Sequence, residues 1–164
     1  MDDNWDRFAV ENQAGEIAAK LVLHKPLFDF IADAETKEIY RILLERVRVS
    51  SESIRFTFRC DAPDRRRYME MRISSDTDGS VHFHSCLLRQ ESRESMLVST
   101  RQPEHTDKIL NICSWCKQIQ QGENEWVEVE DVVTSLGLFE DRGLPRFSHG
   151  VCPDCKQSLL ESLK

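Results

Sequence analysis

The stretch Cys113-Ser114-Trp115-Cys116 is followed, after 35 intervening residues, by Cys152-Pro153-Asp154-Cys155. Each stretch is a Cys-x-x-Cys pair, in which two thiolates on one tight turn can point at a common centre. Two such pairs supply the four sulfur ligands of a tetrahedral zinc site. The sequence therefore predicts one structural zinc ion bound by the four paired cysteines, Cys113, Cys116, Cys152 and Cys155.

The segment between the two pairs is longer than the roughly 15–20 residues of the simplest zinc-ribbon template, so a small substructure is expected there. Residues 125–129 are predicted to form a strand, and residues 130–136 a helix that ends at Gly137. Pro153 is suited to the first turn of a further helix. We therefore expect a small zinc-ribbon-like module over residues 108–164.

Two residues are predicted to lie next to the zinc ligands. Trp115 sits inside the first pair, where its ring can shield the thiolates from water. His149 precedes Cys152 by three residues, and histidine is also a zinc donor. Because four thiolates already complete the site, His149 is expected beside the ligands and not among them. Trp115 and Trp126 are expected in the core of the module.

The same cysteine spacing has a second interpretation. A Cys-x-x-Cys pair also occurs as a redox dithiol, in which a lowered thiol pKa makes one sulfur a nucleophile. Two pairs in a chain from a reducing compartment favour a bound metal over a disulfide. A thiol-based redox sensor therefore stays open as an alternative function.

Composition and charge limit the location and the partners of the chain. Its 164 residues, 40% of them hydrophobic and 31% charged, are typical of a soluble globular protein. No apolar run approaches the roughly 20 residues that a membrane helix needs, and residues 1–6 lack the features of a secretory signal. We therefore expect a cytoplasmic protein with no membrane partner. The net charge of −7 argues against nucleic acid, so a nucleic-acid-associated zinc adaptor is the weaker alternative.

The N-terminal half has the pattern of a helix followed by a sheet. Residues 38–47 carry apolar side chains at helical spacing, and Thr36 is the expected cap of this helix. Three segments with alternating apolar residues follow, near residues 53–60, 67–74 and 80–88. Turn-rich sequences join them, so the simplest topology is an antiparallel meander whose apolar face packs against the helix.

This order of elements resembles a PAS domain. Two sequence segments add to the resemblance, Asn4-Trp5-Asp6-Arg7-Phe8-Ala9 and Leu27-Phe28-Asp29-Phe30-Ile31. The resemblance implies an α+β fold over residues 1–92, with an antiparallel sheet covered by helices on one face, and a linker over residues 93–107. The small-molecule ligand of such a domain stays unknown. Few residues are left at the N-terminus for the strands that open a usual PAS sheet. We therefore expect an exposed sheet edge that binds a second copy, as a homodimer, or another protein.

The C-terminal part resembles the small Cys-rich module that accompanies sensory domains in bacterial signalling proteins. Residues 112–119, 126–130 and 147–155 carry this resemblance. The sequence has no Gly-rich phosphate loop, no Gly-x-Ser-x-Gly elbow and no His-Glu-x-x-His motif. We therefore expect a non-catalytic protein of signal transduction, sensory or regulatory, whose zinc module presents a surface to a protein partner.

Two further patterns are not predicted to form sites. His82, His84 and Cys86 alternate onto one face of the third strand, but the sequence supplies no fourth metal donor at ligand spacing. Arg65-Arg66-Arg67 is a short basic run in an acidic chain, and it is expected in a solvated loop.

Overall fold

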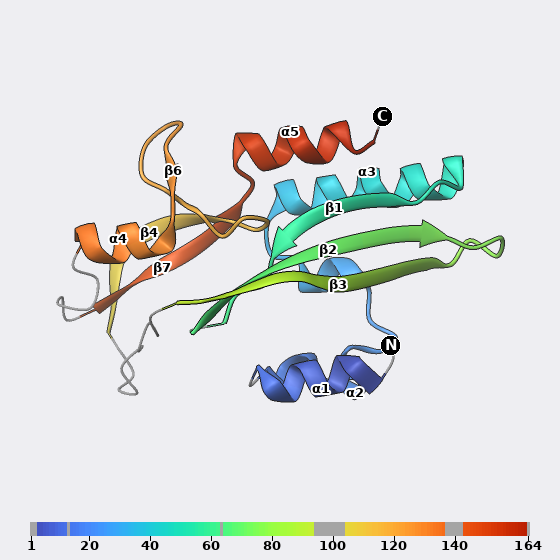
Figure 1. Ribbon diagram of the computed structural model, residues 1–164, viewed down its shortest axis with the longest axis horizontal. Helices are drawn as coiled ribbons and strands as arrows, with labels where there is room; N and C mark the ends of the chain where they lie inside the picture. The colour runs from blue at the N-terminus through green and yellow to red at the C-terminus, as the bar shows by residue number, and fades with distance from the viewer. Residues whose placement is uncertain (1–2, 13, 63, 94–103, 137–142, 164) are drawn as a thin grey trace. The chain divides into compact units, whose positions relative to one another are not determined.

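The computed structural model (Figure 1) describes residues 3–12, 14–62, 64–93, 104–136 and 143–163. These residues form an α+β fold with five α-helices and two β-sheets. The chain divides into two compact units, Met1–Ala32 and Asp33–Lys164. No helix in the described ranges is both long enough and apolar enough to cross a membrane.

The first unit is a series of short helices. The Trp5 indole donates a hydrogen bond to the carbonyl of Ile17 (2.6 Å), and the Asp6 carboxylate accepts one from the amide of Ala19 (2.7 Å). These two bonds hold the first helix against the turns that follow it. The elements are α1 (Asp3–Glu11), η1 (Gly15–Ile17), α2 (Ala19–Val22) and η2 (Leu27–Phe30).

The second unit begins with α3 (Ala34–Ser50), which starts earlier than predicted. Asp33 is the N-cap, because its carboxylate accepts a hydrogen bond from the amide of Thr36 (2.7 Å). The prediction of Thr36 as the cap is therefore wrong. Thr36 is buried in the first turn, and its hydroxyl donates to Ser114 (3.3 Å). The predicted apolar stripe is confirmed, since its buried residues are Ile39, Leu43, Leu44 and Val47.

The predicted antiparallel meander is confirmed. Its strands are β1 (Ile54–Arg59), β2 (Arg65–Ser75) and β3 (Val81–Ser92), in the order β1-β2-β3. Ile54 lies opposite Ile73, and both are buried in the hydrophobic core that contains the apolar face of α3. Figure 1 shows α3 running along this three-stranded sheet. The basic run at residues 65–67 starts β2 and is not a solvated loop.

The α+β class is confirmed, but the PAS topology is not. Of the described residues that precede α3, none forms a strand, and the sheet that follows α3 has three strands. The predicted linker, residues 93–107, has its segment 94–103 outside the described residues. Its last four residues, 104–107, belong to a strand.

The first cysteine pair starts at the end of one strand of a second sheet, and the second pair follows the end of another strand of it. Its strand order is β6-β5-β4-β7; β7 is parallel to β4, and the other pairs are antiparallel. The parallel pair distinguishes this sheet from the hairpins of a simple zinc ribbon. The strands are β4 (Glu104–Cys113), β5 (Ile119–Gln120), β6 (Trp126–Val127) and β7 (Gly143–Gly150).

Two helices complete the C-terminal part. The predicted strand at 125–129 is the short β6, and the predicted helix is α4 (Val129–Leu136), whose Val132 is fully buried. Its predicted end, Gly137, lies outside the described residues. The helix predicted at Pro153 is α5 (Pro153–Glu161), and it lies beside α3, with Leu159 packed into the core.

One hydrophobic core joins α3 and the first sheet to the cysteine-rich part of the chain. From α3 and the first sheet it contains Ile39, Leu43 and Phe56. From the cysteine-rich part it contains Cys113, Trp115, Val151, Cys152 and Leu159. The described residues on both sides of the predicted linker belong to one compact unit, Asp33–Lys164.

Candidate metal centre

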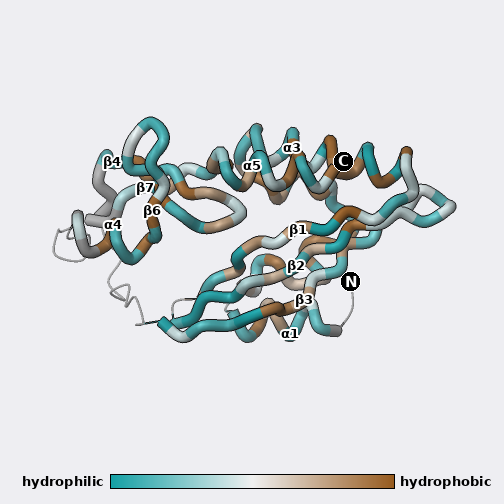
Figure 2. Tube along the Cα trace, turned by 45° about the horizontal axis from the view of Figure 1, so that its top comes forward, coloured by the Kyte–Doolittle hydropathy of each residue, from teal (hydrophilic) through white to brown (hydrophobic). Residues whose placement is uncertain are grey.

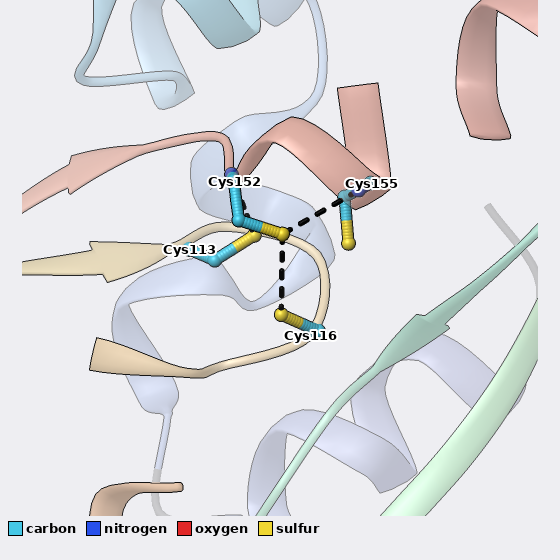
Figure 3. A group of neighbouring side chains, drawn as sticks. All are labelled: Cys113, Cys116, Cys152 and Cys155. Carbon is cyan, nitrogen blue, oxygen red and sulfur yellow. Dashed lines mark hydrogen bonds between the residues drawn. The ribbon is translucent and has the colours of Figure 1, made fainter. Parts of the chain in front are cut away.

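The structure brings all four paired cysteines together. The Sγ atoms of Cys113, Cys116, Cys152 and Cys155 all lie within 4.8 Å of one another. Figure 3 shows the four side chains gathered between the turn after β4 and the start of α5. Cys113 and Cys152 are buried, and Cys116 and Cys155 are half-buried. This cluster is consistent with a tetrahedral zinc site.

The first pair is held by a tight turn at the end of β4. The Cys113 amide donates to the Gln118 carbonyl (2.8 Å), and the Lys117 amide donates to the Cys113 carbonyl (3.1 Å). Lys117 adopts the left-handed conformation (φ 65°), which closes the turn, and its Nζ donates to the carbonyl of Ser114 (2.7 Å). Burial lowers the pKa of Lys117. The backbone hydrogen bonds of this turn thus fix the sulfurs of Cys113 and Cys116 on the same side of the turn.

The second pair is held by the start of α5. Cys152 is the N-cap, and its Sγ accepts a hydrogen bond from the amide of Cys155 (3.4 Å). The Cys152 amide itself donates to Cys113 Sγ (3.4 Å), which links the two pairs. The positive end of the helix dipole favours a thiolate at this position. Pro153 occupies the first helical turn, as predicted.

Gly150 allows β7 to approach β4 just before the second pair. A Cβ at this position would lie 3.1 Å from Asn111 Oδ1, closer than side chains normally pack. The Gly150 carbonyl accepts a hydrogen bond from the amide of Ser114 (2.8 Å), which connects β7 to the first cysteine turn. Close packing of β7 against Asn111 of β4 therefore explains why a glycine follows Ser148 and His149.

Without a cation the four sulfurs cannot all be thiolates. Hydrogen bonds from the thiols of Cys116 and Cys155 lower the pKa of Cys113. Donating to Cys113 raises the pKa of Cys116 to about 12, and it raises the pKa of Cys155 as well. Among these three thiols, Cys113 is therefore the one that ionises most readily. A divalent metal would supply the positive charge that lets all four ionise.

The two predicted neighbours of the metal have different positions. His149 lies on β7 opposite Ile112 of β4, with an exposed side chain, and the group of close metal donors in the described residues contains the four cysteines alone. Trp115 is buried, and its ring stacks on Tyr40 of α3, with ring centroids 6.0 Å apart. A second ring contact joins it to Phe56 of β1. Trp115 therefore belongs to the core shared with the first sheet.

The start of α3 contacts both cysteine turns, which the sequence did not predict. Ser114 of the first turn hydrogen-bonds Asp33 (3.5 Å). The Glu35 carboxylate accepts hydrogen bonds from the amide of Val151 (3.3 Å) and from the ammonium of Lys156 (2.8 Å). No local spacing in the sequence links these residues, because the paired residues lie 81 to 121 positions apart.

A network of ion pairs connects the first sheet to the start of α4. Arg59 is buried and pairs with Asp61 and with Glu128 (2.6 Å). Burial by itself lowers the pKa of Arg59, but its hydrogen bonds to the two carboxylates outweigh burial and raise that pKa. Arg66 of the basic run pairs with Glu130 (2.7 Å).

Glu130 also pairs with Arg93 (3.0 Å). Burial raises the pKa of Glu130, but its bonds to Arg66 and Arg93 outweigh burial and lower that pKa to about 2. The network therefore keeps three guanidinium groups opposite carboxylates of the cysteine-rich part. It is a second connection between the two parts of the unit, independent of the metal ligands.

The chemistry of the site follows from its donor set. Four sulfur ligands complete a tetrahedral zinc site and leave no position for a water molecule or a substrate. Two of the four sulfurs also lie close to each other, since Cys116 Sγ and Cys152 Sγ are 3.7 Å apart. Comparisons with protein-family models, with curated proteins and with solved structures find no match to this chain.

Proposed function

We propose that the protein is a non-catalytic, cytoplasmic sensory or regulatory protein whose C-terminal part is organised by a structural zinc ion and presents a surface to a protein partner. The observation that carries the proposal is the cluster of four sulfur atoms within 4.8 Å. The cluster lies in the same core as α3 and the first sheet. The metal thus acts on the scaffold and not on a substrate.

A structural role is favoured over a catalytic one. A catalytic zinc ion keeps one coordination position open, whereas four thiolates close the site. Zinc sites of this kind contribute on the order of 10 kcal/mol to folding. That contribution is comparable to the whole stability of a domain, roughly 5–15 kcal/mol. We therefore assign the zinc ion to holding the turn after β4 against the start of α5.

A redox sensor is the second candidate. The distance of 3.7 Å between Cys116 Sγ and Cys152 Sγ favours it, because two thiols this close can form a disulfide once the metal is absent. The two functions differ in the resting state of the protein. A structural zinc protein is purified with its metal, and a thiol sensor is purified as a metal-free dithiol.

Metal analysis of protein purified without added zinc tests the proposal. We expect at least one zinc ion per chain, and protection of the four clustered thiols from alkylation while Cys60 is modified. Cys152→Ser should lose this zinc ion, and Cys60→Ser, which changes a half-buried cysteine outside the cluster, should keep it. Metal-free protein that forms a reversible disulfide between the clustered thiols would support the redox sensor instead.

A further inference from the structure

Three metal donors lie on the outer face of β3. His84 is opposite Arg72 of β2 and Cys86 is opposite Glu70, whereas Phe83, which lies between His82 and His84, is opposite the buried Ile73. His82, His84 and Cys86 therefore point away from the core. His82 and His84 are exposed, and Cys86 is half-buried. Within one chain these donors lack a fourth ligand, because the described residues contain one group of close donors, the four-cysteine cluster.

The edge of β3 offers a surface for a second strand. Among the described strands, β3 pairs with β2 alone, so within the described residues the backbone groups of its other edge have no strand partner. On its core side, Phe83 is 41% exposed and Leu87 is 52% exposed. Figure 2 shows this hydrophobic stretch partway along β3. A long edge strand with exposed apolar side chains is a template for strand pairing.

The sequence of β3 is complementary to itself about Ser85. If two β3 strands pair in antiparallel fashion with Ser85 opposite the partner's Ser85, Phe83 faces the partner's Leu87 on the core side. On the outer face, His84 then faces the partner's Cys86. Both contacts occur twice because of the two-fold symmetry. The pairing runs from His82 to the partner's Leu88, and it ends where the register between β2 and β3 shifts.

We propose that two copies of this chain join through β3 and bind one zinc ion between them with His84 and Cys86 of each copy. Facing Cβ atoms in an antiparallel pair are about 4.5–5.5 Å apart, and alternate residues of one strand are about 7 Å apart. The four donors thus occupy the corners of a small rectangle on one face. Two cysteines and two histidines are a common tetrahedral donor set for zinc.

The surroundings of this site are balanced in charge. Two thiolates neutralise the zinc ion, and each copy adds one carboxylate, Glu70, and one guanidinium, Arg72, from β2. His82 is not a ligand in this register, because it faces the partner's Leu88 and already hydrogen-bonds Asp76 (2.9 Å). The proposal names a partner for the proposed function, and its metal site shares no residue with the four-cysteine cluster.

Sedimentation equilibrium and metal analysis of the full chain with added zinc chloride test the proposal. The wild type should be a dimer with one zinc ion per dimer beyond the ion of each four-cysteine cluster. His84→Ala and Cys86→Ser should halve the mass and lose the shared ion, and they should keep the ion held by four thiolates. His82→Ala is the matched control and should behave as the wild type. A monomeric wild type in excess zinc, or a Cys86→Ser dimer with unchanged metal content, would overturn the proposal.

A cross-link tests the register. Ser85→Cys should form a disulfide between position 85 of the two copies on mild oxidation, and peptide mass spectrometry can locate it. Val81→Cys should not cross-link to itself, because in this register Val81 lies beyond the paired residues and far from position 81 of the partner. The reverse result would overturn the pairing about Ser85. Either result leaves the zinc content of the four-cysteine cluster as a separate readout, so failure here and failure of the proposed function are distinguishable.

Discussion

Replacing Trp115 with alanine tests whether the first cysteine turn stabilises the core of α3 and β1. Trp115 is 4% exposed, and its ring contacts Tyr40 and Phe56, which lie outside the cysteine-rich part. The change removes none of the four sulfur ligands. The backbone hydrogen bond from the amide of Arg59 to the carbonyl of Trp115 (2.7 Å) can also persist. We therefore expect a loss of stability without a loss of zinc.

The expected loss is large because the ring is almost fully buried. Truncation of a buried tryptophan to alanine costs about 3–5 kcal/mol, which includes the transfer of the ring and the cavity left behind. Contacts between aromatic rings account for about 0.5–1.5 kcal/mol each within that range. For a unit of this size the midpoint of thermal unfolding should fall by roughly 10–20 °C.

Urea unfolding followed by far-ultraviolet circular dichroism measures the effect, because α3 contributes strongly to that signal. Trp126→Ala is the matched control, since Trp126 is only half-buried and packs at the margin of the same core. It should cost less than Trp115→Ala. If Trp115→Ala kept its zinc and unfolded at the midpoint of the wild type, the turn would not stabilise α3, and the reasoning from a shared core would be refuted.

Three further predictions concern contacts within the unit Asp33–Lys164. Arg59→Ala removes the buried guanidinium that pairs with Asp61 and Glu128, and it should lower the free energy of unfolding, measured in urea, by about 3–5 kcal/mol. The control Arg65→Ala removes an exposed ion pair and should lower that free energy by less than about 1 kcal/mol. Glu130, with its pKa lowered to about 2, stabilises the fold above its ordinary pKa of 4.5 and loses this contribution as the pH falls towards 2. Urea midpoints measured over that interval should fall less in Glu130→Gln than in the wild type, and equal slopes would contradict the assignment. Gly150→Ala should destabilise the pairing of β4 with β7, because the new Cβ meets Asn111, and Asn111→Ala should recover most of the loss; strictly additive effects in the double variant would argue against this contact.

Some features of the chain could be predicted because their signals are local. The four clustered cysteines come from two pairs with ligand spacing, and a tight turn needs only a few neighbouring residues to place two sulfurs. The apolar stripe of α3 and the alternation of β1 and β2 reflect side-chain periods of 3.6 and 2 residues, which a single sequence displays. These elements are accordingly confirmed.

Other features depend on residues far apart in the chain, for which one sequence contains no signal. An arginine such as Arg66 is expected in solvent when only the sequence is known. It pairs with Glu130 because the fold brings α4 close to β2. Asp33 and Thr36 are both suitable caps by residue type, so the backbone conformation decides between them, and Asp33 has the extended one. The burial of Trp115 against Tyr40 likewise follows from tertiary packing and not from the cysteine motif.

The parallel pairing of β4 with β7 has a consequence for folding kinetics. Because the two strands run in the same direction, the chain between them must cross over and return before their first mutual hydrogen bond forms. Contacts of such high contact order form slowly, since chain entropy is lost before any contact is gained. Two residues after the end of β7, the amide of Cys152 donates to Cys113 Sγ at the end of β4. We therefore predict that a zinc ion, if both cysteine pairs bind it before the strands pair, closes this loop early and accelerates the nucleation of the second sheet as well as stabilising it.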